Sequence, residues 1–168
     1  DGLQHAHSKG VVHRDMKPSN LILDPEGRLR ILDFGLAHLE GQESLTVSDV
    51  VVGTPLYMSP EQARQRRIKI DHRTDIYSLG ATMYEALTDR PPFKGKNYQD
   101  TLSQILVRDP VVPRRVNPRV PKDLETIVLK CLRKEPGDRY GTAEALAQDL
   151  EDSLWKFSRC VLLQRVNL

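Results

Sequence analysis

The chain has 168 residues, 39% of them hydrophobic and 29% charged, which is typical of a globular domain with one sizeable core. Its 25 basic and 23 acidic residues give a net charge of +2, and the basic residues gather only in short clusters such as Arg64, Arg66, Arg67 and Lys69. This balance argues against nucleic acid or a membrane surface as a partner of this segment.

The cysteines and histidines indicate neither a disulfide framework nor a metal centre. Cys131 and Cys160 lie in no metal-ligand spacing, and two thiols in a chain of this length favour a reducing, cytoplasmic setting. His5, His7 and His13 lack a carboxylate partner or a helical i, i+4 pair, so zinc is not favoured. No apolar run is long enough to cross a bilayer, although a longer parent protein could carry an anchor elsewhere.

The first third of the chain predicts a small hairpin followed by a loop. Short aliphatic runs at 21–23 and 29–32 flank residues 24–27, Asp-Pro-Glu-Gly, whose proline and glycine are turn residues. The stretch from His38 to Ser48 has few large apolar side chains, so we expect a mobile surface loop there.

Beyond Pro60 the apolar pattern becomes helical. A nearly uncharged run at helical spacing over 76–87 predicts a helix buried on most sides, the central pillar of the fold. Shorter helices are expected around 102–106 and over 124–132. A last helix is expected to be capped by Thr142 and to carry apolar residues on its inner side, namely Ala143, Leu146, Ala147, Leu150 and Leu154. We expect one domain over 1–156 and a tail of uncertain structure over 157–168.

Oxygen-bearing side chains gather around the predicted hairpin. Asp15 and Asn20 are separated by four residues just before the first strand, and Asp33 follows the second strand. A hairpin of this length would fold Asp33 back over Asn20, and carboxylate and amide oxygens suit Mg²⁺. Together with Lys17, these residues offer the orienting carboxylate, the metal ligands and the cation that phosphoryl transfer from ATP requires.

Three motifs occur in a specific order. They are His13-Arg14-Asp15-x-Lys17-x-x-Asn20, then Asp33-Phe34-Gly35, then Gly53-Thr54-Pro55-x-Tyr57-Met58-Ser59-Pro60-Glu61. This series resembles the signature of the eukaryotic-type protein kinases, and the general style is similar to bacterial members of that family. The resemblance runs from about Leu3 to about Trp155.

The resemblance implies a fold class. It is the mainly α large (C-terminal) lobe of the α+β protein-kinase-like fold, with a short β-hairpin that carries the catalytic and metal-binding loops. We expect the small N-terminal lobe to be absent. No two of the ten glycines are separated by a single residue, as a phosphate-covering G-x-G loop requires, and only twelve residues precede His13.

The resemblance also implies roles at the catalytic centre. Asp15 would orient the substrate hydroxyl and accept its proton, and Lys17 would contact the γ-phosphate of ATP. Asn20 and Asp33 would hold Mg²⁺, with Mn²⁺ a possible substitute, and Ile22 would lie under the adenine ring.

Further positions that match the family imply supporting roles. Asp75 would hydrogen-bond the backbone of the catalytic loop, and Glu61 would pair with Arg139. His13 would pack within the loop, and Thr54 would bridge Asp15 and Lys17. Phe34 and Gly35 complete the metal-binding motif.

The predicted loop after Asp33 contains two candidate phosphorylation sites, Thr46 and Ser48. A phosphate there could form bidentate bonds with Arg14, which immediately precedes the catalytic aspartate. The alternative is that both are plain solvated hydroxyls. Our hypothesis is activating autophosphorylation, with Thr46 slightly favoured.

The functional prediction is a serine/threonine protein kinase that acts on protein substrates. The lysine two positions after Asp15 favours the serine/threonine branch of the family, and we expect these 168 residues alone to bind ATP weakly and to lack useful activity. The alternative is a pseudokinase or docking module that has kept the fold. Asp15, Lys17, Asn20 and Asp33 are all present, which favours the enzyme. Substrate identity and oligomeric state cannot be read from these residues.

Overall fold

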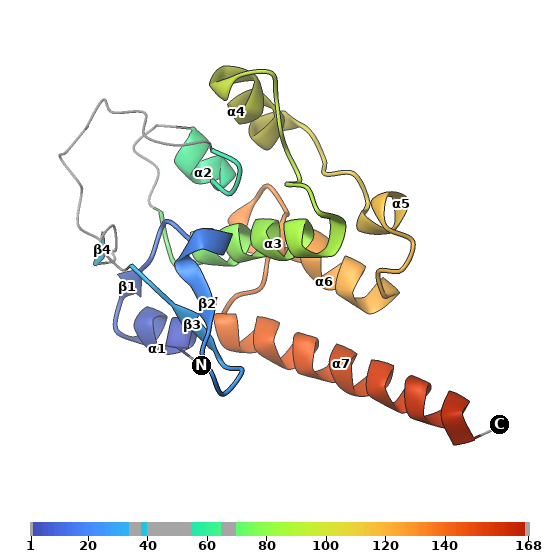
Figure 1. Cartoon of the computed structure of the whole chain (residues 1–168). Helices are drawn as coiled ribbons and strands as arrows, with labels where there is room; N and C mark the ends of the chain where they lie inside the picture. The colour runs from blue at the N-terminus through green and yellow to red at the C-terminus, as the bar shows by residue number, and fades with distance from the viewer. Residues whose placement is uncertain (1, 34–37, 40–54, 65–69, 167–168) are drawn as a thin grey trace.

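The computed structural model describes residues 2–33, 38–39, 55–64 and 70–166. They form a mainly helical body with two small two-stranded antiparallel sheets (Figure 1). Helix α3 (Arg73–Thr88) runs through the middle of the molecule, with α6 (Lys122–Cys131) packed against it. The long helix α7 (Ala143–Val166) contacts α6 and the N-terminal helix α1 (Gly2–Ser8). This is the helical architecture with a short hairpin that the sequence predicts.

The predicted hairpin is confirmed. Strand β2 (Leu21–Leu23) pairs with β3 (Leu29–Ile31), with Leu21 opposite Ile31 and Leu23 opposite Leu29. Gly27 has a φ of +76°, which a residue with a side chain adopts only with strain, so glycine suits this turn. Beyond the last ladder pair, the Leu32 N–H donates to the Asn20 carbonyl at 2.8 Å. The two ends of the hairpin are therefore held side by side.

The prediction of a loop over 38–48 was wrong at its first two residues. His38–Leu39 form strand β4, which pairs antiparallel with β1 (Val11–Val12), Val12 standing opposite His38. A two-residue strand is too short to show alternation of apolar and polar side chains, and its partner precedes the whole hairpin, so the sequence pattern could not reveal it. The rest of the expected loop, residues 40–48, lies outside the described residues.

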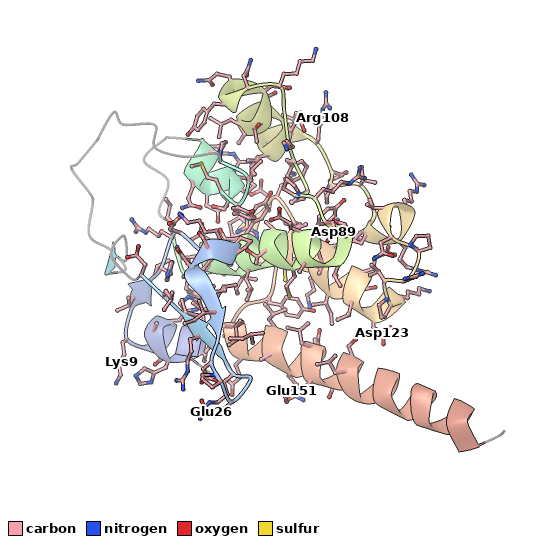
Figure 2. All side chains as sticks on the ribbon, viewed as in Figure 1. Lys9, Glu26, Asp89, Arg108, Asp123 and Glu151 are labelled. Carbon is pink, nitrogen blue, oxygen red and sulfur yellow. The ribbon has the colours of Figure 1, made fainter. Side chains whose placement is uncertain are left out.

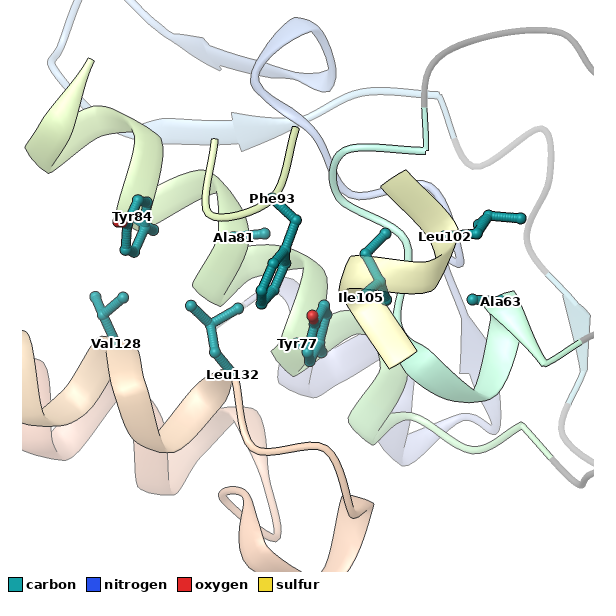
Figure 3. Close-up of a cluster of buried hydrophobic side chains, with 9 residues drawn as sticks. All are labelled: Ala63, Tyr77, Ala81, Tyr84, Phe93, Leu102, Ile105, Val128 and Leu132. Carbon is teal, nitrogen blue, oxygen red and sulfur yellow. The ribbon is translucent and has the colours of Figure 1, made fainter. Parts of the chain in front are cut away.

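Side chains from α2, α4 and α6 pack against α3 to form the main core. Because α3 is covered on most sides, Tyr77, Ala81 and Tyr84 are at most 1% exposed. Figure 3 shows this cluster, which comprises Ala63, Tyr77, Ala81, Tyr84, Phe93, Leu102, Ile105, Val128 and Leu132. A second cluster comprises Ile76, Ile127, Cys131, Tyr140 and Leu146. Burial of each large apolar side chain stabilises the fold by roughly 1.5–3 kcal/mol.

A glycine allows α3 and α6 to approach closely. A Cβ atom added to Gly80 would lie 2.4 Å from the Cβ of Cys131, nearer than two such atoms can come. Gly80 is therefore a point of close approach between these two central helices.

Local signals mark the remaining helix ends. Helix α2 (Pro60–Ala63) begins after Ser59, and α4 (Tyr98–Val107) begins after Asn97, whose side chain accepts from the Asp100 N–H at 2.9 Å. Helix α3 ends at Thr88 and is followed by Asp89, which has a left-handed φ of +57°. Helix α5 (Pro113–Val116) and two 3₁₀ turns, η1 (Pro18–Asn20) and η3 (Pro136–Asp138), each start with proline.

Helix α7 differs from its prediction on one face. Thr142 caps it, since its hydroxyl accepts from the Ala145 N–H at 3.1 Å. Leu154, however, is 57% exposed and Ser153 is only 5% exposed. The inward face follows Leu146, Leu150 and Ser153, which are four and then three residues apart, so Leu154 is rotated off it. The helix continues to Val166, through most of the segment whose structure the sequence left open.

Charged side chains of both signs lie around the outside of the body. Figure 2 labels six exposed examples from different parts of the chain, namely Lys9, Glu26, Asp89, Arg108, Asp123 and Glu151. Of the helices that the structure describes, none has both the length and the apolar character needed to span a bilayer.

Candidate active site

Three predicted side chains meet in the loop between β1 and β2. The Lys17 Nζ donates to the Asp15 Oδ2 at 2.7 Å. The Asn20 Nδ2 donates to the same oxygen at 3.2 Å and to the Asp15 backbone carbonyl at 2.8 Å. Pro18 starts the η1 turn, with its fixed φ, and the turn carries Asn20 back toward Asp15. The loop therefore brings the Lys17 ammonium and the Asn20 amide together at the Asp15 carboxylate.

The acid and the cation remain accessible. The side chains of Asp15 and Lys17 are 32% and 38% exposed, so their ion pair in isolation is worth little, about 0–1 kcal/mol. A pair held this weakly can exchange partners with a bound ligand. In such an exchange the carboxylate can accept a hydrogen bond from a hydroxyl, and the ammonium can contact a phosphate.

The hairpin brings the two residues predicted to hold metal to its adjoining ends. Because the Asn20 Nδ2 donates to Asp15 twice, the amide oxygen is turned away from that residue. Asp33 comes directly after Leu32, whose N–H binds the Asn20 carbonyl, and its φ of +58° is one that aspartate tolerates. The Asn20 amide oxygen and the Asp33 carboxylate thus come from neighbouring ends of the hairpin.

This donor set fits Mg²⁺. Within the described ranges, no three His, Cys, Asp or Glu side chains come together as a metal-binding group. Mg²⁺ commonly takes only one or two protein ligands and completes its octahedral shell with water and substrate phosphates. One carboxylate and one amide oxygen match that requirement.

Asp75 holds the backbone in front of Asp15. Its carboxylate accepts from the His13 N–H at 2.9 Å and from the Arg14 N–H at 2.7 Å, and the His7 Nε2 lies 2.8 Å from it. Asp75 is fully buried at the start of α3, where an ionised carboxylate is tolerated only with such partners. The rigid central helix thereby positions the loop.

His13 joins Asp15 to the other end of the hairpin. The Asp15 N–H donates to the His13 Nδ1 at 3.2 Å, so that nitrogen carries no hydrogen in this arrangement. The hydrogen is then on Nε2, which donates to the Leu32 carbonyl at 3.0 Å. His13 is completely buried, and it links the residue before Asp33 to the amide of Asp15.

Arg139 and Glu61 form a buried bidentate ion pair, with both nitrogen–oxygen distances 2.7 Å. The remaining bonds of the guanidinium go to the carbonyls of Arg73, Arg133 and Lys134, at 2.8–3.0 Å. All five N–H groups of the arginine are thus used, as a buried guanidinium requires. The pair ties α2 to the start of α3 and to the loop before α7.

The remaining predicted residues divide into two groups. Ile22 lies on β2 and is 45% exposed. The apolar side chains of Leu23, Leu29 and Leu32 in the same hairpin are exposed as well. The others lie outside the described residues, and they are Phe34, Gly35, Thr46, Ser48 and Thr54.

The sequence did not single out two residues that contact this site. His7 seemed to lack a carboxylate partner, yet it bonds to Asp75, which lies 68 residues away, and no local signal could have found that contact. Gln62 binds the Arg14 carbonyl through its side chain at 2.8 Å. A signal for Gln62 was available, since Ser59-x-x-Gln62 matches the capping-box pattern of a helix start.

Comparison with known proteins agrees with this geometry. The family model "Protein kinase domain" matches residues 1–150. The chain therefore belongs to the protein kinase domain family, which confirms the resemblance drawn from its motifs. Members of this family typically use ATP and Mg²⁺.

The relatives compared are bacterial kinases. The chain is 45% identical over 144 residues to "Tyrosine-protein kinase MasK" of Myxococcus xanthus, covering 86% of this chain and 22% of that protein. It is 38% identical over 154 residues to "Probable serine/threonine-protein kinase SCO3848" of Streptomyces coelicolor, with coverages of 90% and 23%. It is 40% identical over 150 residues to "Serine/threonine-protein kinase PknB" of Mycolicibacterium smegmatis, with coverages of 88% and 24%. The chain thus spans less than a quarter of the length of each of these relatives.

Proposed function

We propose that the natural protein containing this chain transfers the γ-phosphoryl group of ATP to a serine or threonine hydroxyl of a protein substrate. In this proposal residues 1–156 are the C-terminal lobe of its kinase domain and residues 157–168 are a tail. The observation that carries the proposal is the convergence of Lys17 and Asn20 on the Asp15 carboxylate, in a loop held by the buried Asp75.

Each residue has a role that its position supports. Asp15 accepts a hydrogen bond from the acceptor hydroxyl and takes its proton as the phosphoryl group arrives. Lys17 moves from Asp15 to the γ-phosphate, and its charge stabilises the migrating group. Asn20 and Asp33 hold Mg²⁺ or Mn²⁺, which neutralises phosphate charge when bound. The exposed side chain of Ile22 supports the adenine ring.

Tyrosine is a second candidate acceptor. Lys17, two positions after Asp15, favours serine and threonine, and two of the relatives described above are named serine/threonine kinases. The relative from Myxococcus xanthus, at 45% identity, is named a tyrosine kinase. The acceptor is therefore the part of the proposal that most needs a direct test.

Phosphoamino-acid analysis of the full-length protein supplies that test. After incubation with radiolabelled ATP, Mg²⁺ and a mixed protein substrate, we expect phosphoserine and phosphothreonine, and no signal from the Asp15→Asn variant. Detection of phosphotyrosine alone would show that the acceptor is tyrosine and not serine or threonine. Equal signals from the wild type and Asp15→Asn would contradict the role of Asp15, and no transfer by either would favour the docking-module alternative.

Arg14 supports the proposal of regulation by phosphorylation. Its Nε is buried and has no hydrogen-bond partner among the described residues, and burial lowers the pKa of the guanidinium although Asp75 opposes the shift. A phosphate on Thr46 or Ser48 would supply an anionic partner. We expect mass spectrometry of the active full-length protein to find one of these two residues phosphorylated, with Thr46 favoured, and finding neither modified would remove the idea.

A further inference from the structure

The side chain of Gln62 connects three parts of the molecule. Its Nε2 donates to the Arg14 carbonyl in the catalytic loop at 2.8 Å. Its Oε1 accepts from the Ser59 N–H at 3.0 Å and lies 3.1 Å from the hydroxyls of Ser59 and Thr74. Ser59 begins α2 and Thr74 lies in the first turn of α3, and both are completely buried. One amide therefore bridges α2, α3 and the catalytic loop.

The chemistry of its partners determines which way this amide faces. The Ser59 N–H can only donate, and the Arg14 carbonyl can only accept. If the amide were turned over, an oxygen would face a carbonyl and an NH₂ group would face an N–H, which would lose both bonds. The Gln62 Nε2 therefore faces the Arg14 carbonyl and donates to it.

The bond from Gln62 completes the support of one peptide group. The peptide that joins Arg14 to Asp15 is planar, so its carbonyl and its N–H turn together. Gln62 binds the carbonyl, and the His13 Nδ1 accepts from the N–H at 3.2 Å. On the other side of Arg14, Asp75 accepts from that residue's own N–H at 2.7 Å. Arg14 also has a φ of +66°, a strained value that persists only where neighbouring groups impose it.

We propose that Gln62 is a positioning residue for Asp15. By holding the Arg14–Asp15 peptide plane, it sets the direction in which the Asp15 side chain leaves the backbone, and it couples the start of α2 to the catalytic loop. This inference rests on the proposed function of Asp15. The bond of Gln62 to the catalytic loop goes to the Arg14 carbonyl, so its influence on transfer passes through the backbone.

Two substitutions isolate the donor of Gln62. Gln62→Glu keeps the shape and the acceptor for Ser59 and Thr74, and glutamate suits this capping-box position, but an ionised carboxylate cannot donate to the Arg14 carbonyl. Gln62→Met removes the donor without adding a charge. Ser59→Ala is the matched control, because it removes the cap hydroxyl of α2 and leaves the bond from Gln62 to Arg14.

Steady-state kinetics of the full-length protein test the proposal. We expect kcat to fall about tenfold in both Gln62 variants, the effect of a transition-state loss near that of one hydrogen bond, with KM for ATP and for substrate within about twofold. Ser59→Ala should lower the melting temperature and keep kcat within about twofold of wild type. A kcat that is unchanged in Gln62→Met, or that falls only in Gln62→Glu, would overturn the proposal.

Amide exchange gives a readout that does not depend on catalysis. We expect exchange over residues 13–17 to be at least about fivefold faster in Gln62→Met than in wild type or Ser59→Ala. Unchanged exchange there overturns the positioning role, even if the protein transfers phosphate. If wild type and Asp15→Asn are equally inactive while exchange responds as expected, the proposed function fails and the structural coupling stands.

Discussion

Replacing Arg139 with alanine should be among the most damaging single changes in this fold. The substitution leaves the Glu61 carboxylate, which is 4% exposed, without its partner, and it removes the donors to the carbonyls of Arg73, Arg133 and Lys134. Breaking a buried ion pair from one side costs about 3–5 kcal/mol, because the remaining charge stays buried.

The three carbonyls add to that cost. Each loses a bond worth about 1 kcal/mol, although a carbonyl near the surface can recover part of it from water. We therefore expect the free energy of unfolding to fall by about 4 kcal/mol or more. Since domains are typically stable by only about 5–15 kcal/mol, the variant should be at the edge of folding.

Urea unfolding followed by circular dichroism measures this change. Arg139→Lys keeps the charge but not the bidentate geometry, so its free energy of unfolding should fall by less than that of Arg139→Ala. It provides a second measurement if the alanine variant does not fold. Arg64→Ala is the matched control, since its pair with Glu135 is 3.3 Å long and exposed, and should be worth below about 1 kcal/mol. The reasoning fails if Arg139→Ala costs no more than Arg64→Ala.

Three further predictions concern pH, packing and metal. Burial lowers the pKa of Lys134 to about 8; the charge of Arg139 also lowers this pKa, and the charge of Asp109 raises it. In the unfolded chain a lysine has a pKa of about 10.4, so between about pH 8 and about 10.4 the unfolded chain binds more protons than the folded chain. The free energy of unfolding of wild type minus that of Lys134→Met should therefore rise over this pH range. A flat difference would contradict this. Gly80→Ala should cost about 1–3 kcal/mol in urea unfolding because its Cβ would strike Cys131, whereas Gly137→Ala, with no atom within 4 Å of the new Cβ, should cost much less; equal losses would refute the contact. Chelation of divalent metal should abolish phosphoryl transfer by the full-length protein, and added Mg²⁺ or Mn²⁺ should restore it. The Asn20→Ala variant should need roughly tenfold more Mg²⁺ than wild type for half-maximal rate. An unchanged Mg²⁺ requirement would exclude Asn20 as a ligand.

The parts of the site that depend on neighbouring residues could be predicted from the sequence. The turn residues at 24–27 and the aliphatic runs beside them predict a hairpin, and a hairpin of that length brings Asp33 back beside Asn20. Helical periodicity likewise predicts α3 as a buried helix. These features involve residues that are close in the chain, where local propensity acts directly.

Other contacts could be expected only from resemblance to a family. Nothing in the residue pattern shows that Asp75 binds a loop about 60 residues earlier, or that Arg139 meets Glu61 at a separation of 78 residues. Such contacts depend on how the helices pack, and the short pattern around each residue carries no record of that.

The sequence by itself therefore determined the types of chemistry present and the hairpin that aligns Asn20 with Asp33. The tertiary structure decided what holds Asp15 in place, namely the bonds from Asp75, His13 and Gln62 to the backbone around it. It also decided the β1–β4 pairing and the inward face of α7. The physical reason is that a buried polar group must find a partner wherever packing places one, whatever the distance along the chain.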